Sequence, residues 1–337
     1  MSPGLFRVLF LLMLFFSASA LAVNCQRAVT PLENTICNND NLHWLDSTLM
    51  VVYHQALQQE GVEDSNKKYD DWGKLLKKCT SDNCIERAYY AGISALSDTN
   101  RDFKWEGKWW NMLAPNMSGG VIQFSRNAQW SATLDIRAWA GLNQDEFTAE
   151  ARRFYGMLAV DNIAETSNCK LLLIPKKDGS LQVYSNSDWG CRLSMPAGVF
   201  LDGAYQLSET DPRPKPTLLS LGIFADAVLD EKFRQLVGDD YQNFVNSANV
   251  YIYQDDIDNI GARVLSMWVQ GAANSRTAII MYTPKGEIWA GRISPAKGGG
   301  LELHYYSTDG SDQRKMPRTL ASWKLRFLDN QTALLNK

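Results

Sequence analysis

Three histidines, His43, His54 and His304, are the residues best suited to bind a metal or to transfer protons at neutral pH. His43 and His54 are eleven residues apart, about three turns of a helix, so both could lie on one side of it. No third ligand stands nearby in the sequence, and two-histidine zinc sites are uncommon. His304 lies between Leu303 and Tyr305 with no evident partner. The sequence therefore favours solvated helix histidines for the first pair, and a surface residue rather than a general base for His304.

Two acidic motifs have the residue types for metal binding or for acid and base catalysis. Residues 256–261 place aspartates at positions one and three and a glycine at position six, as a calcium loop does. Position five is Ile260 and position twelve is Met267, so the acidic ligands that complete the coordination are missing. Asp239 and Asp240 are an adjacent carboxylate pair, but neighbours on one element point in different directions. We expect an acidic turn at the first motif and no catalysis at the second.

The sequence offers no nucleophile for a hydrolase. It contains no Gly-x-Ser-x-Gly, no His-Glu-x-x-His and no phosphate-binding loop. The closest cysteines, Cys79 and Cys84, have four residues between them, where a redox Cys-x-x-Cys site has two. The prediction is a protein that is not an enzyme, with no catalytic residue, no metal site and no cofactor.

Residues 1–22 have the composition of a secretory signal peptide. Arg7 precedes an unbroken apolar run over residues 8–16, and small residues follow, ending at Ala20 and Ala22. The run is shorter than the roughly 20 apolar residues that cross a membrane. Cleavage after Ala20 or after Ala22 fits, because each has a small residue at the cut and another two positions before it. We expect a periplasmic or secreted protein with no membrane span in the mature chain.

The net charge and the cysteine content of the mature chain indicate which partners and which crosslinks to expect. Removing Arg7 with the signal peptide moves the formal net charge from −3 to −4, and this mild acidic balance predicts no nucleic-acid partner. The remaining length exceeds one average domain. All six cysteines lie in the mature chain, and an even number in an exported protein predicts disulfides.

Residues 23–100 are predicted to form a small helical domain. Apolar residues recur at spacings of three and four within residues 42–57, 69–76 and 85–96, which indicates three helices. Asp40 or Asn41 can cap the first of them. So small a unit buries little apolar surface, so covalent crosslinks are expected.

The cysteine pairs follow from the way in which these helices would fold back. If the first two helices are antiparallel, Cys79 returns to the level of Cys37, and the next turn brings Cys84 towards Cys25. Cys169 and Cys191 remain as the last pair. The predicted disulfides are Cys25–Cys84, Cys37–Cys79 and Cys169–Cys191.

The same segment carries a recognisable pattern of residue types. It has a Cys, a Thr-Pro-x-Glu-like segment ending in Ile-Cys, a Leu-x-x-Leu-Asp helix ending in Tyr, and a Trp seven residues before a Cys. The pattern is formed by Cys25, Glu33, Ile36, Cys37, Leu42, Leu45, Asp46, Tyr53, Trp72, Cys79, Cys84 and Tyr89. In these positions the chain resembles the N-terminal domain of the LprI-like lysozyme-inhibitor family. Leu76 and Gly92 stand where that pattern has basic residues. The resemblance implies an envelope-located inhibitor or binding module whose partner is a lysozyme-type enzyme.

Residues 101–207 are predicted to form a β-rich domain. Strand-like runs occur at residues 121–124, 130–137, 170–174 and 181–184. The Asp178-Gly179 dipeptide predicts a hairpin turn, and the spacing of apolar residues over 144–158 predicts one inserted helix.

Residues 208–216 contain three prolines and are predicted to be a linker, because proline cannot continue a helix or a central strand. Residues 217–337 are predicted to form a second β-rich domain, with a helix over 218–237. Its predicted strands cover residues 250–253, 262–269, 277–282, 287–293, 301–306 and 320–328.

The predicted fold class is α+β, with a small disulfide-stapled helical N-terminal domain followed by two β-rich domains. The predicted function is non-catalytic binding in the bacterial envelope, with lysozyme inhibition as the activity that the resemblance implies. The alternative is an envelope assembly or peptidoglycan-binding protein, because some of the eleven tryptophans could stack on sugar rings. Buried tryptophans in small β domains are the competing explanation for that count.

Overall fold

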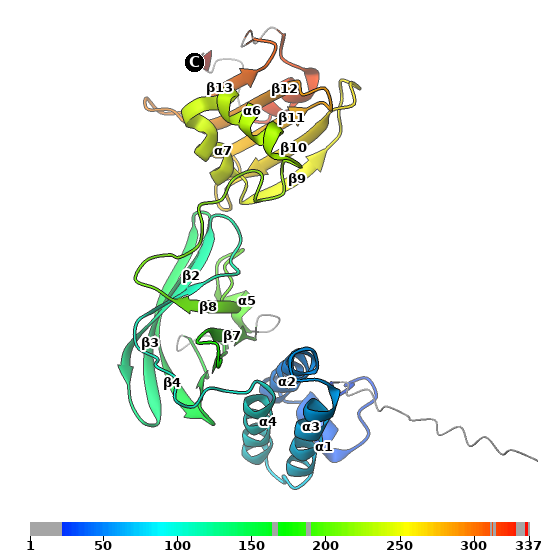
Figure 1. The fold of residues 1–337 in the computed structure, drawn as a ribbon, viewed down its shortest axis with the longest axis vertical. Helices are drawn as coiled ribbons and strands as arrows, with labels where there is room; N and C mark the ends of the chain where they lie inside the picture. The colour runs from blue at the N-terminus through cyan, green and yellow to red at the C-terminus, as the bar shows by residue number, and fades with distance from the viewer. Residues whose placement is uncertain are drawn as a thin grey trace, which may run out of the picture. The chain divides into compact units, whose positions relative to one another are not determined.

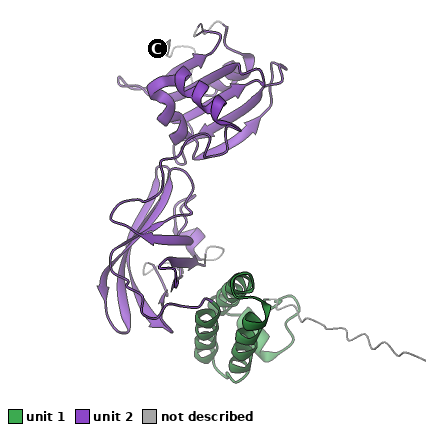
Figure 2. Ribbon diagram, viewed as in Figure 1, with its two compact units in different colours: residues 1–96 green, residues 97–337 purple. Residues whose placement is uncertain are grey.

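The computed structural model describes residues 22–163, 168–186, 190–310, 312, 315–327 and 334–335. Apart from Ala22, the predicted signal peptide lies outside the described residues. The chain forms two compact units, residues 1–96 and residues 97–337 (Figure 2). The first unit is helical and the second is β-rich, which confirms the predicted mixture of helix and sheet.

The described part of the first unit, from residue 22 on, contains four helices (Figure 1). They are α1 Pro31–Cys37, α2 Asp40–Gln59, α3 Val62–Leu76 and α4 Asp82–Leu96. The last three correspond to the predicted helices, whereas α1 was not predicted. Helix α1 begins with a capping box, in which the Thr30 hydroxyl accepts from the Glu33 N–H and the Glu33 carboxylate accepts from the Thr30 N–H. The cap of α2 is Asn39, not Asp40 or Asn41 as predicted.

The core of the first unit lies between α2, α3 and α4. Leu45 and Leu49 of α2 and Tyr89 of α4 are completely buried. Trp72 of α3 packs against Tyr89, with 5.5 Å between the ring centroids. A Cβ atom added to Gly92 would lie 2.4 Å from the Trp72 ring, so only glycine lets the indole approach α4 this closely. The basic residue that the LprI-like pattern has at this position would not fit.

The disulfides of the first unit differ from the prediction. Cys25 is joined to Cys37 and Cys79 to Cys84, with Cα separations of 5.5 and 5.3 Å. The predicted pairs Cys25–Cys84 and Cys37–Cys79 were wrong because the prediction omitted α1. That helix ends at Cys37 and allows the preceding segment to return to it, while Cys79 and Cys84 face each other across the turn between α3 and α4.

The first part of the second unit is a closed barrel of eight antiparallel strands in chain order, in which β8 pairs back onto β1. The strands are β1 Lys108–Asn111, β2 Ser118–Asn127, β3 Ser131–Ala140, β4 Asn143–Phe154, β5 Met157–Val160, β6 Leu171–Pro175, β7 Leu181–Ser185 and β8 Gly203–Leu207. Alternate residues of β3, from Ala132 to Ala138, are buried in the apolar interior. The barrel is therefore filled by its own side chains.

The helix predicted over residues 144–158 was wrong, because this segment forms β4 and β5. Phe147, Ala149 and Ala151 alternate towards the barrel interior, which is the period of a strand. Ten residues of β3 pair with ten of β4, and the two residues before β5, Tyr155 and Gly156, have positive φ angles that turn the chain. The hairpin predicted around Asp178-Gly179 is confirmed, since it joins β6 to β7.

The second part of this unit is a six-stranded sheet in the order β14-β13-β12-β11-β10-β9. The strands are β9 Val250–Gln254, β10 Arg263–Trp268, β11 Thr277–Tyr282, β12 Ile288–Pro295, β13 Leu301–Ser307 and β14 Leu334–Leu335. One face is covered by α6 Ala227–Val237 and α7 Tyr241–Ser247, which are joined by the 3-10 turn η2 Gly238–Asp240 (Figure 1). The short helix α8 Arg318–Lys324 packs on the other face.

Two predicted elements of this region are corrected. Residues 218–226 are turns, so the helix predicted from residue 218 begins only at Ala227, where the Asp226 side chain caps it. The strand predicted over 320–328 is replaced by α8 in the described residues. Leu320 and Trp323, three residues apart, share one buried side of that helix.

Residues 208–216 contain no helix or strand, but they are bonded to the barrel. The Arg213 guanidinium donates to the carbonyl oxygens of Ala114 and Ser118, at 3.2 and 2.8 Å. It also pairs with Asp211 at 2.7 Å. The barrel and the sheet belong to one compact unit, so their division into two domains stays a prediction.

Candidate functional site

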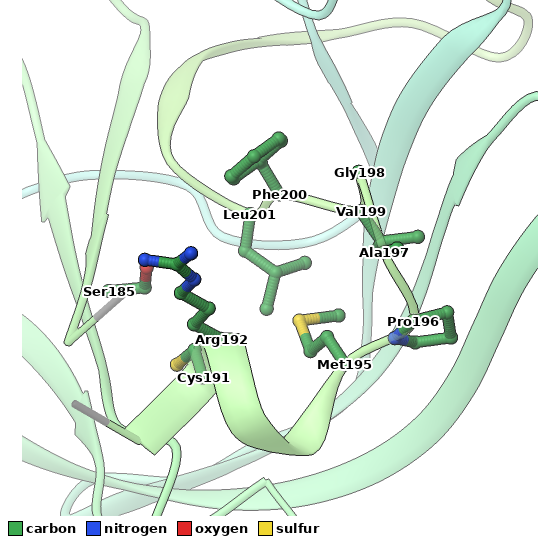
Figure 3. Close-up of a pocket in the computed structure, with 10 residues that line it drawn as sticks. All are labelled: Ser185, Cys191, Arg192, Met195, Pro196, Ala197, Gly198, Val199, Phe200 and Leu201. Atoms are coloured by element: carbon green, nitrogen blue, oxygen red, sulfur yellow. The ribbon is translucent and has the colours of Figure 1, made fainter. Parts of the chain in front are cut away.

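A cavity of about 580 Å³ lies beside the chain segment that connects β7 to β8. This segment contains the short helix α5 Arg192–Ser194. The buried apolar residues of the lining, Cys191, Met195, Val199 and Leu201, also belong to the barrel core. Figure 3 shows the Phe200 ring on one side of the cavity and the Arg192 guanidinium on another, beside Ser185. The cavity has the size and the mostly apolar lining of a small-molecule site.

The walls of this cavity are held at both ends of the connecting segment. The Cys169–Cys191 disulfide, which was predicted, fixes the start of α5. At the other end, the Asp202 carboxylate accepts hydrogen bonds from the N–H and the hydroxyl of Ser185. The buried Asn186 side chain accepts from the Lys170 N–H at 2.8 Å and donates to the Asn168 carbonyl at 2.7 Å. The segment is therefore fastened to β6 and β7, although residues 187–189 lie outside the described ranges.

Arg192 gives the cavity its charge. Among the described residues of the lining it is the one that carries a charge, and its side chain is exposed at the edge of an apolar surface. It makes no ion pair with any residue that the structure describes. A guanidinium in this position can donate two parallel hydrogen bonds to a carboxylate or a phosphate. The arrangement suits an apolar molecule that carries one acidic group.

Of the adjacent carboxylates, Asp239 is exposed, whereas Asp240 is half-buried and belongs to a second polar cluster. Both oxygens of Asp240 accept hydrogen bonds from Arg292, at 2.7 and 3.0 Å, and the Tyr306 hydroxyl donates to Oδ2 at 2.9 Å. Burial by itself would raise the pKa of Asp240, but these bonds and the charge of Arg292 hold it below its ordinary value. Both oxygens of this carboxylate are therefore occupied by hydrogen bonds within the sheet region.

His304 is not the partnerless surface residue that was predicted. Its side chain is 13% exposed, and Nε2 lies 3.1 Å from Glu302 Oε1 and 3.3 Å from Ser294 Oγ. Nδ1 lies 3.9 Å from Asp240 Oδ2. The prediction failed because pairing of β12 with β13 places Arg292 opposite His304, and the turn before α7 adds Asp240. Of these contacts only Glu302, two residues away on the same strand, is a neighbour of His304 in the sequence.

These residues do not form a catalytic relay of serine, histidine and carboxylate. Such a relay needs the serine on one imidazole nitrogen and the carboxylate on the other. Here Ser294 and Glu302 approach the same nitrogen, and the distance from Nδ1 to Asp240 exceeds that of a hydrogen bond. The cluster instead fastens the start of α7 to the sheet.

The other residues considered for metal binding are not grouped around one point, or their carboxylates already accept hydrogen bonds from the protein. His43 and His54 lie on α2, where His43 is half-buried and His54 is exposed. Asp256 accepts hydrogen bonds from the backbone N–H groups of Asp258, Ile260 and Ala262. Asp258 in turn caps the start of α8. Among the described residues, no three His, Cys, Asp or Glu side chains are grouped to hold a metal.

Most of the described tryptophans are buried in cores or half-buried, so their main role is packing and not the binding of sugar rings. Trp72, Trp105, Trp109 and Trp323 are all buried. Trp130 differs, because its side chain is 73% exposed in the turn between β2 and β3. Trp130 is therefore the described tryptophan best placed to stack on a sugar ring.

The sequence did not predict the cavity. Its walls come from a segment that contains no catalytic or ligand-binding motif, and its charge comes from one arginine. A weak signal was present, because Pro196 and Gly198 follow closely on Cys191, a cysteine of a predicted disulfide. Such a segment is irregular in structure and fixed at one end, which is typical of binding loops.

Comparisons with family models, with curated proteins and with solved structures find no match. No helix in the described part of the chain is long and apolar enough to cross a membrane.

Proposed function

We propose that this chain is an exported, non-catalytic binding protein, and that the cavity beside α5 is its ligand site. The observation that supports this most directly is the combination of an apolar lining with one guanidinium, Arg192. The Cys169–Cys191 disulfide holds the lining in place before a ligand arrives, which lowers the entropy cost of binding. We propose an acyl chain that ends in a carboxylate or phosphate as the ligand class.

Titration calorimetry of the mature chain with dodecanoate and with dodecanol tests this proposal. The carboxylate should bind more tightly than the alcohol, and R192Q should remove that preference while leaving binding of the apolar chain. R126Q is the matched control, because Arg126 is an exposed arginine of the same barrel, at the end of β2. Replacing Met195 by Trp should fill the cavity and reduce binding of both ligands. Equal effects of R192Q and R126Q, or no binding of either ligand, would contradict the proposal.

A second candidate function, inhibition of a lysozyme-type muramidase, rests on the LprI-like resemblance of residues 23–100. The apolar residues of that pattern are core residues, since Leu42, Leu45, Trp72 and Tyr89 are all buried. They stabilise the unit, so contact with an enzyme would have to come from other side chains. An inhibitor can act by filling the cleft in which the two catalytic carboxylates reach the sugar.

The best placed segment for that role is the loop closed by the Cys25–Cys37 disulfide, in which Val29 is 82% exposed. A muramidase assay with the mature chain tests this candidate. V29D should weaken inhibition, whereas V62D, at an exposed valine at the start of α3, should not. If the unmodified chain slows no lysozyme but binds peptidoglycan, and W130A removes that binding, the envelope-binding alternative replaces this candidate.

A further inference from the structure

Asp46 is a buried carboxylate in the middle of α2. The residue is 2% exposed and belongs to the core of the first unit. Its oxygens accept two hydrogen bonds, one from the Tyr89 hydroxyl at 2.9 Å and one from the backbone N–H of Val23 at 2.7 Å. The one charged group that acts on it among the described residues is His43, which lies on the same helix. Burial raises the pKa of this carboxyl above its ordinary value, against the opposing effect of both hydrogen bonds.

A buried carboxylate without a cation bonded to it is costly to a fold, and no lysine or arginine among the described residues is paired with Asp46. The titratable groups that face it are His43 on its own helix, Tyr69 on α3 and Tyr89 on α4. None of these is a lysine or an arginine. The backbone nitrogen of Val23, in contrast, lies against Oδ2 and is one residue beyond the small residue Ala22.

We propose that Asp46 is the binding site for the new N-terminus that forms when a signal peptidase cuts the bond between Ala22 and Val23. Hydrolysis of this bond consumes one water molecule. It leaves a carboxylate on Ala22 and a primary amine on Val23, and the amine takes up a proton at neutral pH. The nitrogen that donates to Asp46 as a neutral amide thereby becomes an ammonium at the same place, and the buried carboxylate gains its cation.

The position of the bond agrees with this role. Ala22 is exposed and Val23 is half-buried, so the bond lies where the chain enters the folded unit. Two residues later, Cys25 is fixed to the end of α1, which limits how far Val23 can move from Asp46. Cleavage at the other permitted site, after Ala20, would leave two residues in front of Val23 and keep its nitrogen neutral. Asp46 therefore favours cleavage after Ala22 over cleavage after Ala20, because only the first gives Val23 a charged amine.

This inference rests on the export of the chain in the proposed function. The first test is chosen so that it does not require export, and a failure of the inference can then be told apart from a failure of the proposed function. Two mature chains are made with defined first residues, one starting at Val23 and one at Leu21, each with and without D46N. The pKa of the α-amine is measured from the pH dependence of its acetylation, followed by mass spectrometry. The Val23 amine should titrate above the ordinary value of about 8, and the Leu21 amine should not. D46N should return the Val23 amine to its ordinary value.

The stability of the same four chains gives a second readout. At pH 7 the unfolding constant of the first unit should be about tenfold or more lower for the chain starting at Val23 than for that starting at Leu21. A group whose pKa is raised on folding stabilises the fold below its unfolded pKa, so this advantage should shrink as the pH rises above about 8. D46N should remove most of the advantage at every pH.

An ordinary α-amine pKa in the Val23 chain, or an advantage that persists in the D46N background, would overturn the inference. Mass spectrometry of the exported protein gives the third test, for which Val23 is the expected first residue. A first residue of Leu21 would overturn the proposed cleavage site. If only the full-length protein is found, the signal peptide is not removed, and this result contradicts the export in the proposed function. The amine measurements do not depend on that result, because they use chains made with defined first residues.

Discussion

The guanidinium of Arg292 on β12 donates two hydrogen bonds to the carboxylate of Asp240, the residue that immediately precedes α7. The two side chains are each 11% exposed. Because 52 residues separate them in the sequence, this pair connects the helical layer of the sheet region to its strands.

R292M should destabilise the sheet region by about 3 kcal/mol, because it leaves the Asp240 carboxylate buried without its cation. Hydrogen exchange of peptides that cover β12 and β13 measures this as a lower free energy of local opening. R126M is the control, since Arg126 pairs with Glu150 only at 3.7 Å and both side chains are exposed. Its effect should stay within about 0.5 kcal/mol. Equal effects of the two substitutions would show that the Asp240 pair contributes no more than a surface pair.

The same pair should make the stability of the sheet region depend on pH in the acidic range. The pKa of Asp240 is held below its ordinary value in the fold, so its contribution is complete above the unfolded value of about 4. The contribution is lost as the pH falls further, through the folded pKa. Unfolding measured from pH 6 down to pH 2 should therefore show a smaller loss of stability in D240N than in the unmodified chain. An unchanged slope would contradict the assignment.

Two helix glycines of the first unit should respond to alanine in opposite directions. G92A should lower stability by about 1–3 kcal/mol, because the new Cβ atom would overlap Trp72 and Leu49. G73A, on α3, should raise it by about 0.5–1 kcal/mol, because nothing lies within 4 Å of its added Cβ and alanine favours the helix. Thermal melting followed by circular dichroism compares the two. Destabilisation by both would indicate that α3 is more tightly packed than the structure has it.

Peptide mapping of the unreduced protein should recover the disulfides Cys25–Cys37, Cys79–Cys84 and Cys169–Cys191. Thiol titration of the denatured, unreduced chain should detect no free cysteine. Trypsin can cut after Arg27, so Cys25 and Cys37 should appear as two linked peptides, whereas Cys79 and Cys84 should stay within one. A peptide that links Cys37 to Cys79 would restore the pairing expected from the sequence.

R213A should make residues 208–216 more sensitive to proteolysis. The Arg213 side chain supplies two hydrogen bonds that hold this segment on the barrel, and alanine removes both. A protease of broad specificity suits the test, because trypsin does not cut before Pro214 or Pro216. Time courses should show faster release of a fragment that begins near Leu218. K215A is the control, since no hydrogen bond to the barrel is described for Lys215, and it should leave the rate unchanged.

Local signals in the sequence were sufficient for most strands and for the larger helices. The strand-like run at residues 277–282 coincides with β11, and the Asp178-Gly179 turn forms as predicted. Such elements are determined by residues that are close in the chain, through turn chemistry and the period of the apolar positions.

The errors occurred where one spacing fits two structures. Phe147, Ala151 and Phe154 suit a helix, but Phe147, Ala149 and Ala151 suit a strand, and pairing with β3 decides between them. Leu320 and Trp323 form one side of a helix, although a short apolar run of this kind also suits a strand. The deciding contacts come from distant parts of the chain, which local spacing does not contain.

The candidate site was harder to predict than the fold. Asp240, Arg292 and His304 come from three elements and form no motif in the sequence. The cavity is shaped by the path of the backbone between β7 and β8. Arg192, the charged residue among those described in its lining, belongs to no sequence motif. The Asp46 site was partly visible, because Asp46 and Tyr89 both belong to the LprI-like pattern, but its contact with Val23 was not.

The six cysteines form three disulfides, and each disulfide joins two cysteines that are consecutive along the chain: the first to the second, the third to the fourth and the fifth to the sixth. A chain that enters an oxidising compartment with its N-terminal end first presents its thiols in that order. An oxidant that joins each new thiol to the one already waiting would produce the native set directly, with the first pair closed before Cys79 emerges. Maturation of this protein should therefore need a disulfide oxidase but no disulfide isomerase.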